Sequence, residues 1–422
     1  MPDLSYPGPE SIHRHLLDNG LIVLAYENQA AESVVIEGVV RAGALVEESD
    51  VAGRAHFTAE MLLRGAGGRS FEEIYEAIES VGASLEFESG RHTTGFSAGA
   101  LAEDLPLLLQ LLADGLCRPT FPEEQVESLR GELITSLQIQ ANDTRHRAGR
   151  AFRELLYEDH PYRLPVEGDF DSIAGLTRAA LAEYHRDYFG PQGMIVTIVG
   201  AVAPAEALAQ VEAAFGAWLT EARQMPAAPA AYWPAEIIRR DVDMPRKSQS
   251  DVVMGLPGPA RAAEDYLEAS MANVILGVFG MYGRLGKNVR EEQGLAYYIH
   301  SRLLGGLGPS PWAISTGVAP DKVEQAISSI LEEITRLQDE PIPAEELEDC
   351  QAYRTGALPV SLETNDGLAG AICDMELYEL GLDYLQTLTE KIWALTPESV
   401  QAAARKYLSS EQIAIAVAGP QP

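Results

Sequence analysis

Cysteines and basic residues are scarce in this chain of 422 residues, and each shortage excludes a class of protein. The three cysteines are widely spaced and form no Cys-x-x-Cys pair, which argues against a disulfide scaffold and a thiolate zinc site. Lysine and arginine number 31 against 63 acidic residues, which gives a formal net charge of -32. Because nucleic-acid binding needs a basic face that displaces counterions, we expect no nucleic-acid partner; anionic membranes are disfavoured for the same reason.

Long apolar runs are also missing. No stretch approaches the length of a membrane span, and the first residues lack the basic start and apolar segment of a secretory signal. We therefore expect a soluble, cytoplasmic protein. Hydrophobic residues make up 46% of the chain and charged residues 22%, as in globular proteins, and the length predicts two or three domains.

One segment of the chain is repeated. Residues 173–200 and 392–419 both contain Leu-Thr, an Ala-rich helical pattern, an Arg-x-Tyr helix end, a polar turn and a β-branched run that ends in glycine. They align without a gap at a constant offset of 219 residues, as from Leu176 to Leu395. Such self-similarity predicts two copies of one domain.

The join between the copies is predicted at residues 219–235, where proline and alanine dominate and an extended linker is favoured. The predicted domains are therefore 1–218 and 236–422. Strand and helix patterns are mixed without regular βαβ alternation, which indicates an α+β fold with an antiparallel sheet in each domain. In the first half the strand patterns are 21–26, 33–42 and 82–98, and the helix patterns are 53–63, 70–81, 101–117 and 122–140.

His56 stands out because of the helical pattern around it. Positions four apart share a helix face, so His56 and Glu60 could point at one ion, and Glu132 in a later helical pattern could supply a third ligand. One histidine and two carboxylates are an oxygen-rich set for zinc. The alternative is a structural His56, hydrogen-bonded in the core, beside a solvated or ion-paired Glu60.

The stretch around His56 resembles the zinc signature of the pitrilysin and insulinase group of metallopeptidases, which includes the mitochondrial processing peptidases. That signature is His-x-x-Glu-His, with a further glutamate ligand roughly seventy-odd residues later. The resemblance extends to residues 17–24 and 40–47, covers nearly the whole chain, and implies two homologous α+β domains that form a clamp. The chain matches the common form of the signature at Gly53, Ala55, His56, Phe57, Met61, Leu62 and Gly65.

Two positions depart from the signature. Ala59 stands in place of the glutamate that takes a proton from zinc-bound water, and Glu60 stands in place of the second histidine ligand. A methyl group cannot accept a proton, and general-base assistance is worth about 10²- to 10⁴-fold in rate. The sequence therefore predicts that the isolated chain is not an efficient peptidase. It also predicts that His56, Glu60 and Glu132 bind no metal firmly.

A second constellation lies in residues 280–301. Its glycines and Lys287 suggest a phosphate loop, but the glycine spacing is wrong and Asn288 stands where Ser or Thr should hold magnesium. The stretch instead resembles the family's second signature, an Arg and a Tyr seven residues apart that face the zinc site, and Arg290 and Tyr297 match it. A tyrosine hydroxyl can donate to an oxyanion, and an arginine can hold substrate carbonyls. The alternative is that Arg290 pairs with a neighbouring glutamate and Tyr297 is a half-buried strand residue.

In the two-domain members of this family, catalytic and non-catalytic chains pair. The sequence resembles the non-catalytic kind, which implies a homologous partner with an unbroken His-x-x-Glu-His, zinc on that partner, and a peptide substrate. Two other hypotheses stay open: a clamp-shaped scaffold with no role in chemistry, and an autonomous, weakly metal-binding metallopeptidase. The sequence leaves open whether the isolated chain forms a homodimer.

Overall fold

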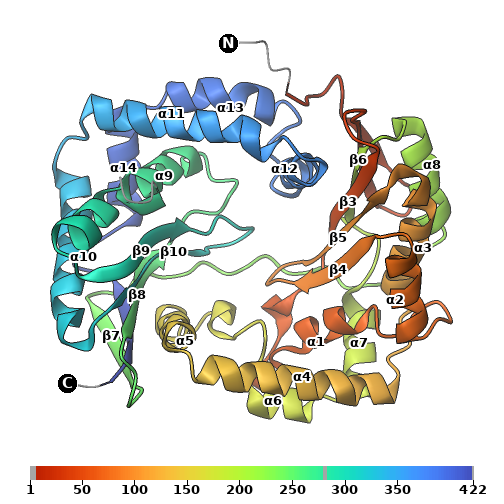
Figure 1. The fold of residues 1–422 in the computed structure, drawn as a ribbon, viewed down its shortest axis with the longest axis horizontal. Coiled ribbons are helices and arrows are strands. Elements are labelled where there is room, and N and C mark those ends of the chain that lie inside the picture. The colour runs from red at the N-terminus through yellow and green to blue at the C-terminus, as the bar shows by residue number, and fades with distance from the viewer. Residues whose placement is uncertain (1–5, 279–282, 421–422) are drawn as a thin grey trace. The chain divides into compact units, whose positions relative to one another are not determined.

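A computed structural model describes residues 6–278 and 283–420 of the chain, whose fold is drawn in Figure 1. The chain divides into two compact units, and each unit consists of several separate segments of the sequence. Unit 1 consists of Met1–Ser136, Leu164–Pro226 and Leu358–Leu388, and unit 2 of Leu137–Arg163, Ala227–Ala357 and Thr389–Pro422. Three helices have residues in both units: α4 (Glu123–Ala141), α11 (Ala344–Ser361) and α13 (Tyr384–Trp393).

Unit 1 is built on a sheet of six strands. Their order is β1 (His13–Leu16), β2 (Ile22–Glu27), β6 (Ile195–Gly200), β3 (Ser33–Val40), β5 (Thr94–Leu101) and β4 (Ser84–Ser89). Neighbouring strands are antiparallel except β2 and β6, which are parallel. The predicted antiparallel sheet is thus a mixed one with a single parallel pair, because β6 arrives from more than 150 residues further along the chain.

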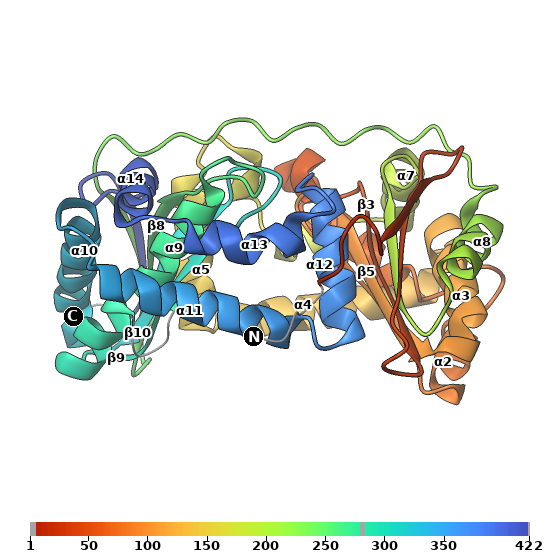
Figure 2. The same cartoon turned by 90° about the horizontal axis from the view of Figure 1, so that it is seen from above.

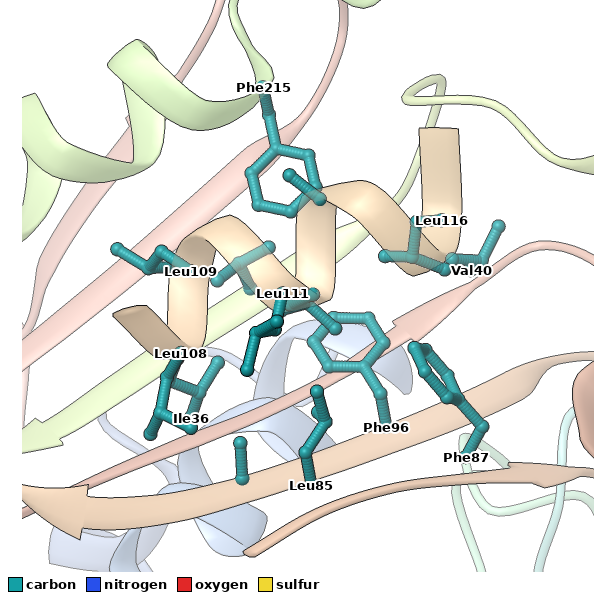
Figure 3. Close-up of a cluster of buried hydrophobic side chains, with 14 of the residues drawn as sticks. Ile36, Val40, Leu85, Phe87, Phe96, Leu108, Leu109, Leu111, Leu116 and Phe215 are labelled. Atoms are coloured by element: carbon teal, nitrogen blue, oxygen red, sulfur yellow. The ribbon is translucent and has the colours of Figure 1, made fainter. Parts of the chain in front are cut away.

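One face of this sheet carries the main apolar core of unit 1. Ile36 and Val40 on β3 point into it, and Phe96 on β5 lies beside Phe87 on β4 with 6.3 Å between ring centroids. The leucines of α3 (Leu105–Cys117) and Phe215 of α8 (Pro204–Phe215) close the cluster from the other side (Figure 3). The remaining helices of the unit are α1 (Arg54–Met61), α2 (Phe71–Ser80), α6 (Phe170–Gly175), α7 (Arg178–Tyr188) and α12 (Asn365–Leu377).

The opposite face of the sheet is covered by α12, which comes from the second half of the chain. This helix packs on β6 and β3 (Figure 2). Ala369, Ile372 and Cys373 are buried on it. On the sheet, all residues of β6 are buried, Val35 of β3 is buried, and Glu37 and Val39 of β3 are partly buried. Since both faces of β6 are covered, its residues are buried without alternation, and Thr197 is the one polar residue among them.

Unit 2 repeats this plan with five strands. Their order is β7 (Ile238–Asp243), β11 (Ala414–Gly419), β8 (Ser250–Pro257), β10 (Pro311–Val318) and β9 (Ala296–Leu303), and here β7 and β11 are the parallel pair. The helix that packs on β11 and β8 is α5 (Thr144–Leu156), which comes from the first half of the chain. The other helices include α9 (Tyr266–Asn273), α10 (Val323–Asp339) and α14 (Pro397–Tyr407).

The internal repeat is present in the structure. Residues 178–188 and 195–200 form α7 and β6, and the same residues shifted by 219 form α14 and β11. Each of these strands lies between a parallel and an antiparallel neighbour; β6 is third in its sheet and β11 second, because unit 1 has the additional edge strand β1. The fold therefore consists of two homologous α+β domains, as the repeat predicts.

Most of the predicted elements lie where the sequence patterns put them. The helix predicted over 101–117 starts at Leu105, because residues 94–101 continue β5. Residues 219–234 have neither helix nor strand, as expected of an extended linker (Figure 2, light green). The domain boundaries at 218 and 236 stay a prediction. Within the described residues, no helix has both the length and the apolarity needed to cross a bilayer.

Candidate functional site

The helix that carries His56, α1, begins at a sharply bent glycine. Gly53 has φ +86, and a Cβ there would lie 2.8 Å from Cα of Gly168. The buried carboxylate of Glu47 caps the helix, since its two oxygens accept from the backbone N–H groups of Gly53 (2.9 Å) and Ala55 (2.6 Å). A helix N-terminus has unpaired N–H groups, and Glu47 satisfies two of them.

The three motif residues of α1 have different surroundings. Ala59 is 1% exposed and belongs to the apolar cluster of unit 1, whereas Glu60 is exposed to solvent. His56 is half-buried and has no hydrogen-bond partner within the described part of the chain. His56 is therefore not the hydrogen-bonded core histidine of the alternative interpretation.

Glu132, the third residue of the predicted set, lies on an exposed face of α4 and is held by an arginine. Arg64 donates to both of its carboxylate oxygens, at 3.0 and 2.6 Å, and Ser128 donates to one of them at 3.3 Å. The hydrogen bonds from Arg64 hold the pKa of Glu132 below its ordinary value. No motif in the sequence pairs Arg64 with Glu132, which lies 68 residues further along the chain.

These residues do not fit a zinc ion. Among the residues that the structure describes, no three His, Cys, Asp or Glu side chains are gathered as a metal site requires. The structure therefore does not bring His56, Glu60 and Glu132 together as one ligand set. In addition, the carboxylate of Glu132 is occupied by Arg64, so a metal would have to displace a bidentate ion pair.

Glu47 is the carboxyl group near the motif that could be mistaken for a replacement base. Burial raises its pKa to about 7, a value that suits proton transfer near neutral pH. Both of its oxygens, however, are already engaged with the backbone of α1. Its role is to cap the helix. The sequence offered one signal for Glu47: it is the last residue of the stretch 40–47, which resembles the family.

Arg290 and Tyr297 lie in unit 2, on either side of a tight turn. Arg290 belongs to a π-helical segment, η7 (Gly286–Glu292), and Tyr297 is the second residue of β9. Gly294 between them has φ +61 and donates its N–H to the carbonyl of Arg290 at 3.1 Å. Residues 280–282, at the start of the predicted stretch, lie outside the described residues.

Both side chains are open to solvent in the chain. The side chain of Arg290 is 44% exposed, and its Nε lies 3.7 Å from a carboxylate oxygen of Glu291, a loose pair. Tyr297 is 84% exposed and is not the half-buried strand residue of the alternative interpretation. An exposed guanidinium and an exposed phenol are free to meet a ligand that comes from outside the chain.

Tyr297 occupies an irregular position in the sheet. On β10, Gly317 pairs with Tyr298 and Val318 pairs with Ala296, so Tyr297 is the extra residue of a β-bulge and has no cross-strand partner. Bulges bend a strand and redirect one side chain. The bulge separates Tyr297 from the regular alternation of the strand.

Two matching α+β domains, one with an altered zinc-motif helix and one with an exposed Arg and Tyr pair, define a peptidase-like protein of the two-domain kind. Residues 22–169 match the family described as Insulinase (Peptidase family M16), and residues 175–353 match the Peptidase M16 inactive domain. The chain belongs to the M16 peptidase family.

Curated relatives of the chain carry the name zinc protease. The chain is 26% identical to an uncharacterized zinc protease of Streptomyces coelicolor, over 98% of this chain and 90% of the relative. It is 28% identical to an uncharacterized zinc protease of Mycobacterium tuberculosis, over 96% of this chain and 93% of the relative.

Solved structures share the fold. A peptidase M16 inactive domain from Pseudomonas fluorescens has a TM-score of 0.91 at 23% identity and covers 97% of this chain and 98% of its own. A protease from Helicobacter pylori has the same TM-score at 18% identity, with 97% and 99% covered.

Proposed function

We propose that the chain is the non-catalytic subunit of a heterodimeric zinc peptidase of the M16 family. In this proposal a homologous partner with an unbroken His-x-x-Glu-His holds the zinc ion. This chain binds the peptide substrate and supplies Arg290 and Tyr297 to the partner's site. Both subunits act in the cytoplasm.

The observation that carries the proposal is the buried methyl group of Ala59 at the position of the general base. Two other carboxylates near α1 are already engaged, Glu47 as the helix cap and Glu132 in its ion pair with Arg64. The chain shares its family with relatives named zinc proteases, but its own motif has alanine at position 59 and glutamate at position 60.

The chemistry proposed for the second signature follows from exposure and charge. When water attacks a peptide carbonyl, negative charge develops on its oxygen, and a phenol or guanidinium donor stabilises that charge. Tyr297 and Arg290 keep their donors free for such a role: among the described residues neither side chain forms a hydrogen bond, and Arg290 has only the loose 3.7 Å pair with Glu291. The charge of -32 favours cationic peptides near the surface.

The test is a reconstitution with a homologous chain that has an intact motif. The purified chain and this partner are mixed, and cleavage of a fluorogenic peptide library is followed. We expect activity in the mixture and none in this chain alone. Tyr297→Phe should lower kcat by about 10²- to 10³-fold, the usual cost of losing an oxyanion donor, and Arg290→Ala should lower kcat/KM.

Matched controls come from exposed residues of the same type. Tyr232 in the linker is also 84% exposed, and Arg186 is a surface arginine paired with Asp187; Tyr232→Phe and Arg186→Ala should leave the rate unchanged. If the complex is stable and its rate of peptide cleavage is unchanged by both Arg290→Ala and Tyr297→Phe, the chain is better described as a scaffold. Zinc-dependent turnover by this chain alone would refute the assignment as non-catalytic.

A further inference from the structure

The residue after the bulge, Tyr298, is fixed by a buried carboxylate two strands away. Its hydroxyl donates to Asp251 on β8, and Asp251 is 1% exposed. On the intervening strand β10, Gly317 pairs with both residues. The phenol ring therefore crosses one whole strand to reach its partner.

Gly317 is what allows the ring to cross. A Cβ at this position would lie 2.6 Å from Cε1 of Tyr298 and 2.4 Å from Nε2 of Gln249. Contacts under 3.0 Å require neighbouring atoms to move, and a ring held at both ends cannot move without losing a contact. The glycine thus leaves a channel across the sheet for the Tyr298 side chain.

Other groups on α5 and next to β8 contact Asp251 and the Tyr298 ring. Thr144 at the start of α5 donates to Asp251, and Gln249 donates to both carboxylate oxygens at 3.2 Å. The guanidinium of Arg145 lies 4.3 Å from the centre of the Tyr298 ring. Burial and the bond to Asp251 raise the pKa of Tyr298, so its hydroxyl stays a donor.

We propose that Asp251 and Tyr298 are positioning residues that lock the register of β9 at the bulge and so fix the direction in which Tyr297 leaves the sheet. A slip of β9 by one residue would take Tyr298 away from Gly317, break its bond to Asp251 and place Tyr297 in the regular ladder. The lock makes that slip costly. The catalytic consequence rests on the function proposed above, because it takes Tyr297 to be the oxyanion donor.

The first experiment needs no partner. In a Cys117→Ser background, spin labels at positions 297 and 328 report a distance within unit 2, since Ser328 is exposed on α10. We expect one narrow distance distribution in the parent. Tyr298→Phe should shift it or add a second population displaced by roughly 3 Å, the rise of one strand residue, and Gly317→Ala should do the same by displacing the ring.

The matched control is Tyr407→Phe, which also removes a tyrosine hydroxyl bonded to an aspartate of unit 2, at 2.7 Å from Asp265. It should leave the distribution unchanged. A reference pair of labels at positions 328 and 345 should not respond to any variant. An unshifted distribution in both Tyr298→Phe and Gly317→Ala overturns the lock, and so does an equal shift in Tyr407→Phe.

The second experiment measures cleavage with the partner chain. If orientation matters, Tyr298→Phe without labels lowers kcat about 10-fold and leaves KM unchanged, because misplacing a catalytic donor costs rate and not binding. Asp251→Asn, which keeps a weaker acceptor, should fall between the parent and Tyr298→Phe. A shifted distance with an unchanged rate supports the lock and counts against Tyr297 as the donor, so the two failures are distinguishable.

Discussion

At the scale of single residues, Ala59 decides what the motif helix can do. Its side chain lies in an apolar cluster, so a carboxylate introduced there alone would be buried without a charged partner. His56 is half-buried and has no hydrogen-bond partner among the described residues, and Thr58 is a second polar residue of the motif on the buried side.

Another carboxyl group, Glu37 on β3, makes stability depend on pH. Burial raises its pKa to about 7, and the nearby carboxylates of Asp366, Asp374 and Glu86 raise it further, against a hydrogen bond from Ser97. In the unfolded chain the group ionises near its ordinary pKa of about 4.5. Between these values the folded state binds more protons, so the free energy of unfolding falls as pH rises from about 4.5 to about 7.

Glu37→Gln should remove this dependence. We expect the variant to be more stable than the parent at pH 8, by about 1 kcal/mol after allowance for the partly solvated site, and about equally stable at pH 4.5. Urea unfolding at both pH values measures the difference. Glu76→Gln, at an exposed position of α2, removes the same charge and should show no such change. A parallel shift of both variants would contradict the role of Glu37.

At the scale of elements, each sheet is covered by a helix from the other half of the chain. The start of α12 is tied to unit 1 by Asn365, whose side chain donates to the backbone oxygen (3.2 Å) and hydroxyl (3.1 Å) of Ser33 and accepts from Asn28 at 2.7 Å. Asn365 is 6% exposed. Hydrogen bonds of this kind fix where the helix begins on the sheet.

Asn365→Ala should therefore loosen α12 more than it changes the rest of unit 1. The variant leaves Asn28 and Ser33 without their partner, which costs about 1–3 kcal/mol. Hydrogen exchange should rise first in residues 365–377, and the urea midpoint should fall. Asn142→Ala, at an exposed asparagine bonded only within its own turn by its side chain, is the control. Unchanged exchange in α12 would show that apolar packing alone holds the helix.

At the scale of the whole molecule, the two compact units do not coincide with the two halves of the chain. Residues 358–388 belong to unit 1 and residues 137–163 belong to unit 2. Each half therefore contributes a buried helix to the unit built mainly from the other half. The linker between the halves is one connection among several.

A cut in the linker should leave the halves together. With a protease site inserted between residues 224 and 231, where the chain has no helix or strand, cleavage should give two bands on a denaturing gel and one species in gel filtration. Burial of α5 and α12 supplies the cohesion. The uninserted chain treated with the same protease is the control. Separation of the fragments under native conditions would contradict the reciprocal exchange of helices.

Local pattern was enough for the helices and strands predicted in the first half of the chain and for the repeat. Helical and strand periodicity placed α1 to α4 and β2 to β5 within a few residues, and the offset of 219 predicted α14 and β11 from α7 and β6. The altered residues at 59 and 60 could also be identified from the sequence, because a motif is defined by residue types at fixed spacing. These features depend on neighbours along the chain.

Neighbours along the chain therefore account for the first-half elements, for the repeated helix and strand, and for the absence of a base from the motif. The parallel strand pair, the exchange of α5 and α12, the ion pair of Glu132 with Arg64 and the bulge at Tyr297 arise only in the folded chain. The physical reason is range: periodicity records which side of an element is apolar, whereas these features are contacts between residues tens to hundreds of positions apart.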